Sequence, residues 1–308
     1  MGLRIRTNIS SINAQRRLKD STMALQSAAE KMASGKRINK AADDAAGLAI
    51  ASKLNADIRS LNQARRNASD GISLVQTAEG GLVETSSMLT RLRELAIQAA
   101  SDTVGVQERS FLNKEFVALK NEIDRLASTS EFNGTRLLVG NADLADDIAN
   151  PKGTFPLEIQ VGKDYFLESD SKSAPNPINV IRIDLEKLNA FTHGEGSLNI
   201  GKGTEGAQVD DKESAQRSIA SLDNALTQVN DYRSYLGSIQ NRLQATVSNL
   251  GVGIENITAA KSRIEDTDFA KQTAEFSSQN ILQQAGSSVL AQANTMPQIA
   301  LNLINSLG

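Results

Sequence analysis

The sequence predicts a mainly α-helical fold: a long antiparallel helical bundle or coiled coil, with a small β-hairpin-rich insertion in the middle of the chain. Two observations carry this prediction. Apolar residues recur in steps of three and four over residues 44–126 and 219–264, which is the spacing of one helix face. Four of the five prolines lie in residues 150–206, where apolar and polar residues instead alternate as they do in strands.

The composition argues against an enzyme. Among 308 residues there is no cysteine and a single histidine, which excludes thiolate chemistry and most histidine-based metal clusters. Aromatic residues make up 4% of the chain, and its aliphatic residues suit a thin helical bundle. The net charge of −3 does not predict nucleic acid as a partner. No apolar run reaches the roughly 20 residues that span a bilayer, so we expect no membrane insertion. Because cysteine is absent and histidine occurs once, we also expect no metal, and we expect no cofactor.

The stretch RINKAADDAAGLAIASKL, residues 37–54, places Asp43 and Asp44 before a small, alanine-rich apolar segment. Two carboxylates can bind a metal or act as an acid–base pair, but no histidine or further carboxylate accompanies them. An aspartate at a helix start accepts hydrogen bonds from free backbone N–H groups and suits the positive helix end. We therefore predict that both residues begin a long helix after a break at Ser34-Gly35, and that the small residues after them let another chain approach closely.

Two helices follow from the apolar spacing. The first runs from about Asp44 to Ser101, and the second covers residues 112–126. A helix with one apolar stripe needs helical partners along that stripe. We therefore expect both helices to pack, as an antiparallel bundle, with a third helix predicted over residues 219–264. The stripe residues are Ile58, Leu61, Ile72, Val75, Leu82, Leu89, Leu92 and Ala96 in the first helix and Leu112, Phe116, Leu119, Ile123 and Leu126 in the second.

The middle of the chain predicts short strands. Asn133-Gly134 is a strong turn pair before a short apolar run. Residues 157–161 and 178–183 alternate apolar and polar side chains, which is typical of strands with one buried face. About 55 residues are few for a separate core, so we expect this region to be a β-rich elaboration at the tip of the bundle.

Residues 219–264 predict one long helix of roughly 70 Å at about 1.5 Å per residue. Gly237, Gly251 and Gly253 lie inside it. Each glycine costs up to about 1 kcal/mol relative to alanine in a helix interior. We expect them to be either local weak points or sites of close packing.

The two terminal segments differ in charge. Residues 1–40 carry nine Lys or Arg residues, whereas residues 269–308 carry Lys271 and Glu275 alone. The C-terminal segment repeats small or apolar residues at helical spacing, but by itself it buries too little to offset its ordering entropy. It either folds on assembly or docks as an ordinary helix on its own domain. The N-terminus lacks the apolar core of a cleaved secretory signal.

Four stretches, in order along the chain, carry a resemblance to the bacterial flagellins. They are LQSAAEKMASGKRINKAADDAAGLAIASKL (25–54), LTRLRELAIQAASDT (89–103), EIDRLASTSEFNGTRLL (122–138) and SRIEDTDFAKQTAEFSSQNILQQAGSSVLAQANTMPQIALNLI (262–304). A small departure is Met32-Ala33, which stands where Leu-Ser is common in the family. The middle of the chain resembles nothing in detail, which indicates a short form with a reduced variable region.

The resemblance implies a division into five parts. Residues 1–43 and 269–308 would be the two halves of an inner coiled coil. Residues 44–149 and 207–268 would form an outer helical domain, and residues 150–206 a short, variable, β-rich region facing solvent.

The resemblance also implies a function: a subunit that self-assembles into the extracellular flagellar filament for swimming motility, exported unfolded through the type III apparatus without a cleaved signal. Its partners would be other copies of itself, an export chaperone at the C-terminal region, and the hook-junction and cap proteins. A hook–filament junction protein and an intracellular coiled-coil scaffold remain alternatives. We expect the ends to fold on polymerisation and the growing interface to contain Ile5, Ile9, Ile12, Leu282, Val289, Leu303 and Leu307.

Two further sites are a surface that resembles a receptor-binding surface and a single histidine. Arg91 and Leu95 lie four residues apart on one helix and so share a face. With Glu115 they resemble the flagellin surface engaged by a Toll-like receptor of animals, although the same face can instead make lateral contacts between subunits. His193 lies in FTHGEG without the second histidine of an H-E-x-x-H metal motif, so we predict a loop histidine.

Overall fold

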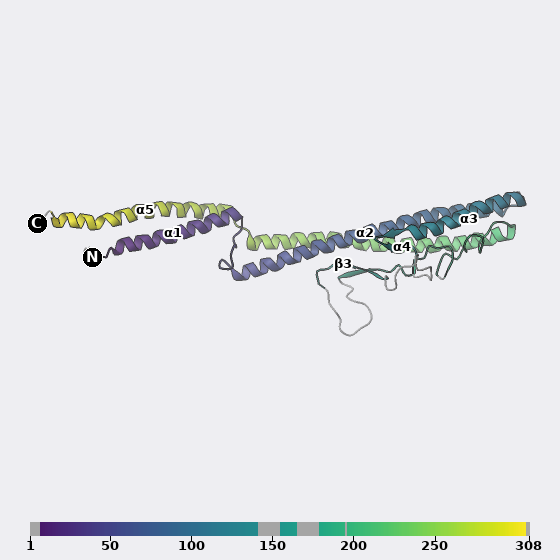
Figure 1. The fold of residues 1–308 in the computed structure, drawn as a ribbon, viewed down its shortest axis with the longest axis horizontal. Helices are drawn as coiled ribbons and strands as arrows, with labels where there is room; N and C mark the ends of the chain where they lie inside the picture. The colour runs from purple at the N-terminus through teal and green to yellow at the C-terminus, as the bar shows by residue number, and fades with distance from the viewer. Residues whose placement is uncertain (1–6, 141–154, 165–178, 195, 306–308) are drawn as a thin grey trace, which may run out of the picture. The chain divides into compact units, whose positions relative to one another are not determined.

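The structure is a computed structural model that describes residues 7–140, 155–164, 179–194 and 196–305, with side chains up to residue 295. Five α-helices account for most of the described residues (Figure 1). They are α1 (Ile9–Ser34), α2 (Ala45–Ala99), α3 (Val106–Thr129), α4 (Lys212–Glu265) and α5 (Phe269–Asn305). The predicted mainly α-helical class is confirmed.

The chain divides into two compact units. The terminal unit comprises residues 1–58 and 255–308, and the central unit comprises residues 59–254. Because the division falls inside α2 and α4, each of these helices contributes to both units. The five-part division stays a prediction.

In the terminal unit, the local sequence determines where α1 begins and ends. Asn8 caps its N-terminus, because the side-chain oxygen of Asn8 accepts a hydrogen bond from the backbone N–H of Ser11 at 3.0 Å. The helix ends at Ser34 because Gly35 adopts a φ of 68°, the left-handed conformation that glycine tolerates best. The predicted break at Ser34-Gly35 is confirmed.

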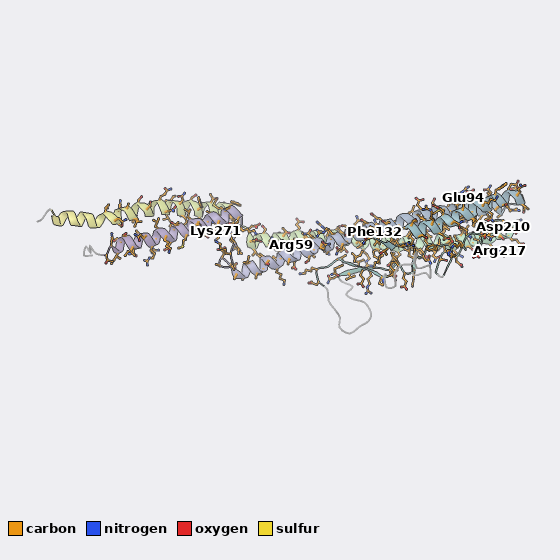
Figure 2. All side chains as sticks on the ribbon, viewed as in Figure 1. Arg59, Glu94, Phe132, Asp210, Arg217 and Lys271 are labelled. Atoms are coloured by element: carbon orange, nitrogen blue, oxygen red, sulfur yellow. The ribbon has the colours of Figure 1, made fainter. Side chains whose placement is uncertain are left out.

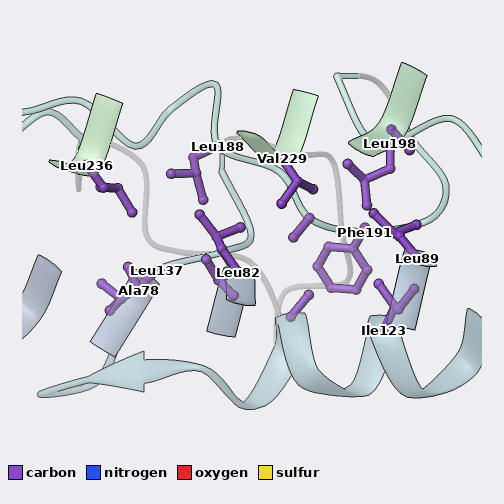
Figure 3. Close-up of a cluster of buried hydrophobic side chains, with 14 of the residues drawn as sticks. Ala78, Leu82, Leu89, Ile123, Leu137, Leu188, Phe191, Leu198, Val229 and Leu236 are labelled. Atoms are coloured by element: carbon purple, nitrogen blue, oxygen red, sulfur yellow. The ribbon is translucent and has the colours of Figure 1, made fainter. Parts of the chain in front are cut away.

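The central unit has one apolar core, made by α2, α3, α4 and the chain that connects α3 to α4 (Figure 3). Residues from each of these segments are buried together. They include Ala78, Leu82 and Leu89 of α2, Ile123 of α3, Leu188, Phe191 and Leu198 of the connecting chain, and Val229 and Leu236 of α4.

Helix α3 buries a stripe that is rotated from the predicted one. Its buried residues are Phe116, Lys120, Ile123 and Ala127, whereas Leu119 of the predicted stripe is only partly buried. The reason is that α3 is covered on two sides. One face of α3 packs in the helical core. The connecting chain between α3 and α4 covers the adjacent face of α3 and so buries it as well.

Two short antiparallel hairpins lie in the connecting chain. In the first, β1 (Glu131–Phe132) pairs with β2 (Thr135–Arg136) around Asn133 and Gly134. Both turn residues have positive φ, 51° and 79°, which is the requirement of a type I′ turn. In the second, β3 (Leu157–Gln160) pairs with β4 (Val180–Ile183), with Leu157 opposite Ile183. The predicted turn is confirmed, and both predicted strands are confirmed within the described residues, whereas Ile178 lies outside them.

The expected position of the middle region, at the tip of the bundle, is wrong. Residues after β4, among them Leu185, Leu198 and Val209, are buried in the same core as the three helices of the central unit. Since some 55 residues cannot build a separate core, they bury their apolar side chains along the helices instead.

Helix α4 extends over 54 residues, which is about 80 Å at about 1.5 Å per residue. A Cβ atom added at Gly237, Gly251 or Gly253 would meet no atom within 4 Å in the described part of the chain. Within a single copy, these glycines are therefore not sites of close packing.

Candidate assembly surface

The contact between α1 and α5 is antiparallel and includes several hydrogen bonds between residues far apart in the sequence. The Asn8 side chain donates to the backbone oxygen of Ala293 at 2.7 Å, and the hydroxyl of Ser11 donates to Asn294 Oδ1 at 2.7 Å. Further along, the hydroxyl of Ser21 donates to the backbone oxygen of Gln279 at 3.2 Å. The residues that α1 buries fully are small, Ser11 and Ala28. This pairing therefore gains little from apolar burial.

The same two helices leave large apolar side chains uncovered. A groove of about 670 Å³ runs between them, lined in part by Leu18, Leu282 and Val289. Leu282 is 52% exposed and Val289 is 54% exposed. Among the described side chains, the other large exposed apolar residues of the pair are Ile9, Ile12 and Met23 in α1 and Phe269 and Ile281 in α5. Large apolar side chains exposed on both helices, beside an open groove, indicate an interaction surface.

The predicted interface residues are only partly described. Ile9 and Ile12 are exposed on α1, while Leu282 and Val289 line the groove together. Leu303 belongs to α5, but its side chain lies outside the described residues. Ile5 and Leu307 also lie outside the described residues, so their part in the interface stays a prediction.

Helix α5 carries almost no charge on this surface. Lys271, labelled in Figure 2, and Glu275 both lie near its start, and the sequence has no charged residue from 276 to 308. Burial of α5 by another protein would therefore remove no charge from water beyond these first turns, which spares the large desolvation cost of an ion.

The two aspartates ahead of α2 have different roles. Asp44 directly precedes the helix, and its Oδ1 accepts from the backbone N–H of Gly47 at 2.8 Å, as an N-cap does. Asp43 instead accepts from the backbone N–H groups of Asn39 and Lys40, both at 3.0 Å, and closes the preceding turn. These two hydrogen bonds hold the pKa of Asp43 below its usual value.

The small residues after Asp44 were expected to let another chain approach closely. At Gly47 the space is instead filled by Asp44 and Ile38 of the same chain.

A polar clasp that the sequence did not predict joins the two parts of the terminal unit. The buried carboxylate of Glu265, the last residue of α4, pairs with Lys36 Nζ at 2.5 Å and with Lys261 Nζ at 3.6 Å. Arg37 donates to the backbone oxygen of Ile264 at 2.7 Å, at the negative end of the same helix. Hydrogen bonding to Lys36, together with the charges of both lysines, lowers the pKa of Glu265.

We expect Glu265→Gln to destabilise the terminal unit at pH 7 by about 1 kcal/mol, because Lys36 is half exposed and solvent screens the pair. A lowered folded-state pKa means that the stabilisation is present above the unfolded pKa of about 4.3 and is lost as pH falls further. Thermal unfolding followed by circular dichroism should therefore separate wild type from the variant at pH 7 and bring them together near pH 3. Glu255→Gln, an exposed change on the same helix, is the control.

The expected receptor residues do not share one surface. Arg91 pairs with Glu115 of α3 at 2.8 Å and with Glu94 at 3.0 Å, and all three are exposed. Leu95, by contrast, is 0% exposed and belongs to the core. Its expected place on the surface is wrong, because α2 turns this residue toward the core of the central unit.

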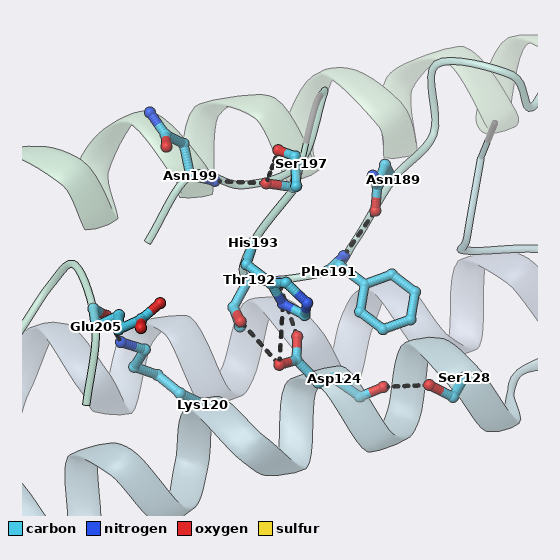
Figure 4. Close-up of polar contacts among 11 residues, drawn as sticks. Lys120, Asp124, Ser128, Asn189, Phe191, Thr192, His193, Ser197, Asn199 and Glu205 are labelled. Carbon is cyan, nitrogen blue, oxygen red and sulfur yellow. Dashed lines mark hydrogen bonds and ion pairs between the residues drawn. The ribbon is translucent and has the colours of Figure 1, made fainter. Parts of the chain in front are cut away.

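A second unpredicted cluster fastens the connecting chain to α3 (Figure 4). The ammonium of Lys120 is buried and donates to the backbone oxygens of Glu205 at 2.7 Å and Ala207 at 3.0 Å. Burial lowers the pKa of Lys120 to about 8. One turn further, Asp124 accepts from the backbone N–H and the hydroxyl of Thr192 at 2.8 and 2.9 Å.

His193 lies in this loop, with its Nδ1 3.5 Å from Asp124 Oδ2. Its ring meets Phe191 edge-on, with the centroids 5.9 Å apart. No group of three or more potential metal ligands occurs among the described residues. In this arrangement the histidine contributes to the attachment of the loop.

Long helices whose terminal pair leaves apolar side chains uncovered indicate a subunit of a larger assembly. Residues 5–143 match the bacterial flagellin N-terminal helical region, and residues 219–304 match the bacterial flagellin C-terminal helical region. The chain belongs to the bacterial flagellin family.

Two curated relatives extend over nearly the full length. The flagellin of Halalkalibacterium halodurans is 41% identical over 300 residues, covering 97% of this chain and 99% of that protein. The flagellin of Bacillus subtilis is 39% identical over 307 residues, covering 98% and 100%. Among solved structures, a putative flagellar hook-associated protein from Vibrio parahaemolyticus covers 73% of this chain and 100% of its own, with a TM-score of 0.54 and 13% identity. That last likeness shows a shared fold alone.

The chain is thus a structural subunit of the bacterial flagellar filament and not an enzyme. Flagellins polymerise into this filament, which lies outside the cell. The junction-protein and scaffold alternatives are not favoured, because the relatives that match nearly the whole chain are flagellins. No helix in the described ranges is long and apolar enough to cross a membrane.

Proposed function

We propose that the helix pair of α1 and α5 orders when the subunit joins the filament, and that its apolar surface then becomes buried between copies. The observation that carries this proposal is the groove around Leu282 and Val289, on a helix almost without charge. Helices this thinly packed are marginal in water by themselves.

The gain on assembly comes from apolar area. Each square ångström removed from water contributes about 25 cal/mol, and the exposed isoleucine, leucine and valine side chains of both helices supply that area. An interface between two different patches of the same chain extends into a fibre when the rotation between successive copies does not close a ring. Polymerisation and folding of the ends are then one event.

The same features suit export in an unfolded form, without a cleaved signal, through the flagellar type III apparatus. Polar contacts and small buried residues hold α1 to α5, so little free energy is lost when the pair opens. An export chaperone would cover the apolar face of α5 before assembly. The hook-junction and cap proteins would meet the same surfaces at the two ends of the filament.

Truncation tests this proposal. The full chain, mixed with short filament seeds, should grow filaments in electron micrographs and gain helical circular dichroism. A chain lacking residues 1–40 and 269–308 should keep the central unit folded and remain monomeric. A full chain that is already fully helical before seeding, or a truncated chain that polymerises, would contradict coupled folding.

Receptor recognition is a second candidate, favoured by the exposed Arg91–Glu115 pair. We expect Arg91→Ala with Glu115→Ala to lower signalling by monomers through the flagellin-sensing Toll-like receptor, because a receptor would lose a charged pair on this face. Reporter cells treated with purified monomers provide the measurement. Arg125→Ala with Glu122→Ala, which removes a comparable exposed pair of α3, is the control. Equal signalling by both double variants and wild type would exclude the site.

A further inference from the structure

A small open pocket of about 300 Å³ lies in the central unit, apart from the terminal helices. Half of its lining comes from α4 and half from the chain that follows β4. The lining residues are Asp231, Tyr232 and Tyr235 from α4, and Asp184, Lys187 and Leu188 from the chain after β4. Two phenol rings and two carboxylates thus border one cavity.

The walls of this pocket are held in place before any ligand arrives. The hydroxyl of Tyr235 accepts from the backbone N–H of Asp184 at 2.9 Å, which joins the two sides. The hydroxyl of Tyr232 accepts from Gln228 Nε2 at 2.9 Å. Burial raises the pKa of Tyr232, so its ring remains a neutral phenol. A preorganised site loses little ordering entropy on binding.

Two carboxylates at the pocket are not paired with a cation among the described residues. Asp231 is exposed and forms no ion pair or hydrogen bond through its carboxylate among the described residues. The Asp184 carboxylate accepts only from the backbone N–H of Glu186, at 3.0 Å, within the described contacts. Lys187 offsets one of the two negative charges. A net negative rim beside aromatic rings attracts a cation.

We propose that this pocket receives an arginine side chain from a second copy of the chain within the filament. A guanidinium is planar, stacks on aromatic faces and hydrogen-bonds to carboxylates, so it matches both kinds of wall. The same chain also offers the donor: Arg59, Arg65 and Arg242 are exposed in the central unit and form no ion pair with the described carboxylates. The inference rests on filament formation but concerns a contact separate from the terminal helices.

Tyrosine fluorescence gives a direct test in monomers. The chain has three tyrosines and no tryptophan, so in full-length protein with Tyr165→Phe all such emission comes from the two pocket residues. Titration with N-acetyl-arginine amide should change this emission and saturate, whereas the uncharged citrulline analogue should not. Asp231→Asn should weaken binding about threefold, the effect of one exposed ion pair. Lys187→Gln, which removes the competing cation, should strengthen it. Emission unaffected by the arginine compound would overturn the proposal.

The same measurement on filaments identifies the source of the cation. If a second copy fills the pocket, the arginine compound should no longer change the tyrosine emission once the protein has polymerised. Filaments that respond as monomers do would overturn the inference and leave the proposed function intact. Failure of the Tyr165→Phe chain and of wild type to polymerise would instead contradict the proposed function and this inference together.

Discussion

The double change Leu282→Lys and Val289→Lys is expected to abolish filament growth without changing the monomer. Both side chains line the groove between α1 and α5 and are about half exposed in one copy, so lysine there remains hydrated. Once the groove is covered by another copy, each ammonium would be buried without a partner. An unpaired buried charge costs about 3–5 kcal/mol, which raises the concentration needed for polymerisation by more than about a hundredfold.

Seeded growth followed by sedimentation and electron microscopy measures this effect, and circular dichroism of the monomer checks its folding. Val106→Lys is the matched control, since Val106 is 77% exposed at the start of α3 and lies in the central unit. It should polymerise as wild type does. Normal filaments from the double variant would show that α5 is not buried in the polymer.

The second large effect is expected at Lys120. Lys120→Ala removes the donor from the backbone oxygens of Glu205 and Ala207 and leaves a cavity beside Phe116. Losing buried hydrogen bonds and packing together should lower the free energy of unfolding of the central unit by about 2–4 kcal/mol. Chemical denaturation followed by circular dichroism measures it. Lys114→Ala, an exposed change on the same helix, should be nearly neutral.

Lys120 also predicts a pH dependence of stability. Its folded pKa of about 8 lies below the value of about 10.4 expected in the unfolded chain. Below pH 8 both states are protonated and the folded state bears the full desolvation cost. Between these two pKa values the folded state releases its proton first, so wild-type stability should rise with pH, by about 1–3 kcal/mol in total. Lys120→Met, which has no such group, should lack this rise; parallel pH profiles would contradict the assignment.

The helices could be predicted from the sequence because their apolar spacing is a local property. The start of α2 could be predicted because Asp44 acts on a backbone N–H only three positions away. The turn at Asn133-Gly134 followed from the positive φ that both residues tolerate. In each case the cause and the effect lie within a few residues of one another.

What could not be predicted depends on contacts between distant segments. Lys120 bonds to residues 85 and 87 positions later, so nothing near it in the sequence marks its burial. A signal did exist: Lys120 follows Phe116 by four positions and precedes Ile123 by three, which places it on the buried face. The burial of Leu95 was missed for a related reason, since shared spacing with Arg91 does not say which side of α2 meets the core.

The antiparallel pairing of α1 and α5 also determines the order in which the molecule can be completed. Asn8 and Ala293 touch across 285 positions of sequence, whereas Arg91 and Glu115 of the central unit are separated by 24. Contacts between distant positions form late, since a long loop must close before they are made. The helical hairpin of the central unit can therefore form early, whereas α1 and α5 can pair only after the long chain between them has been brought together. The connectivity alone thus makes the pairing of α1 with α5 a late step in folding.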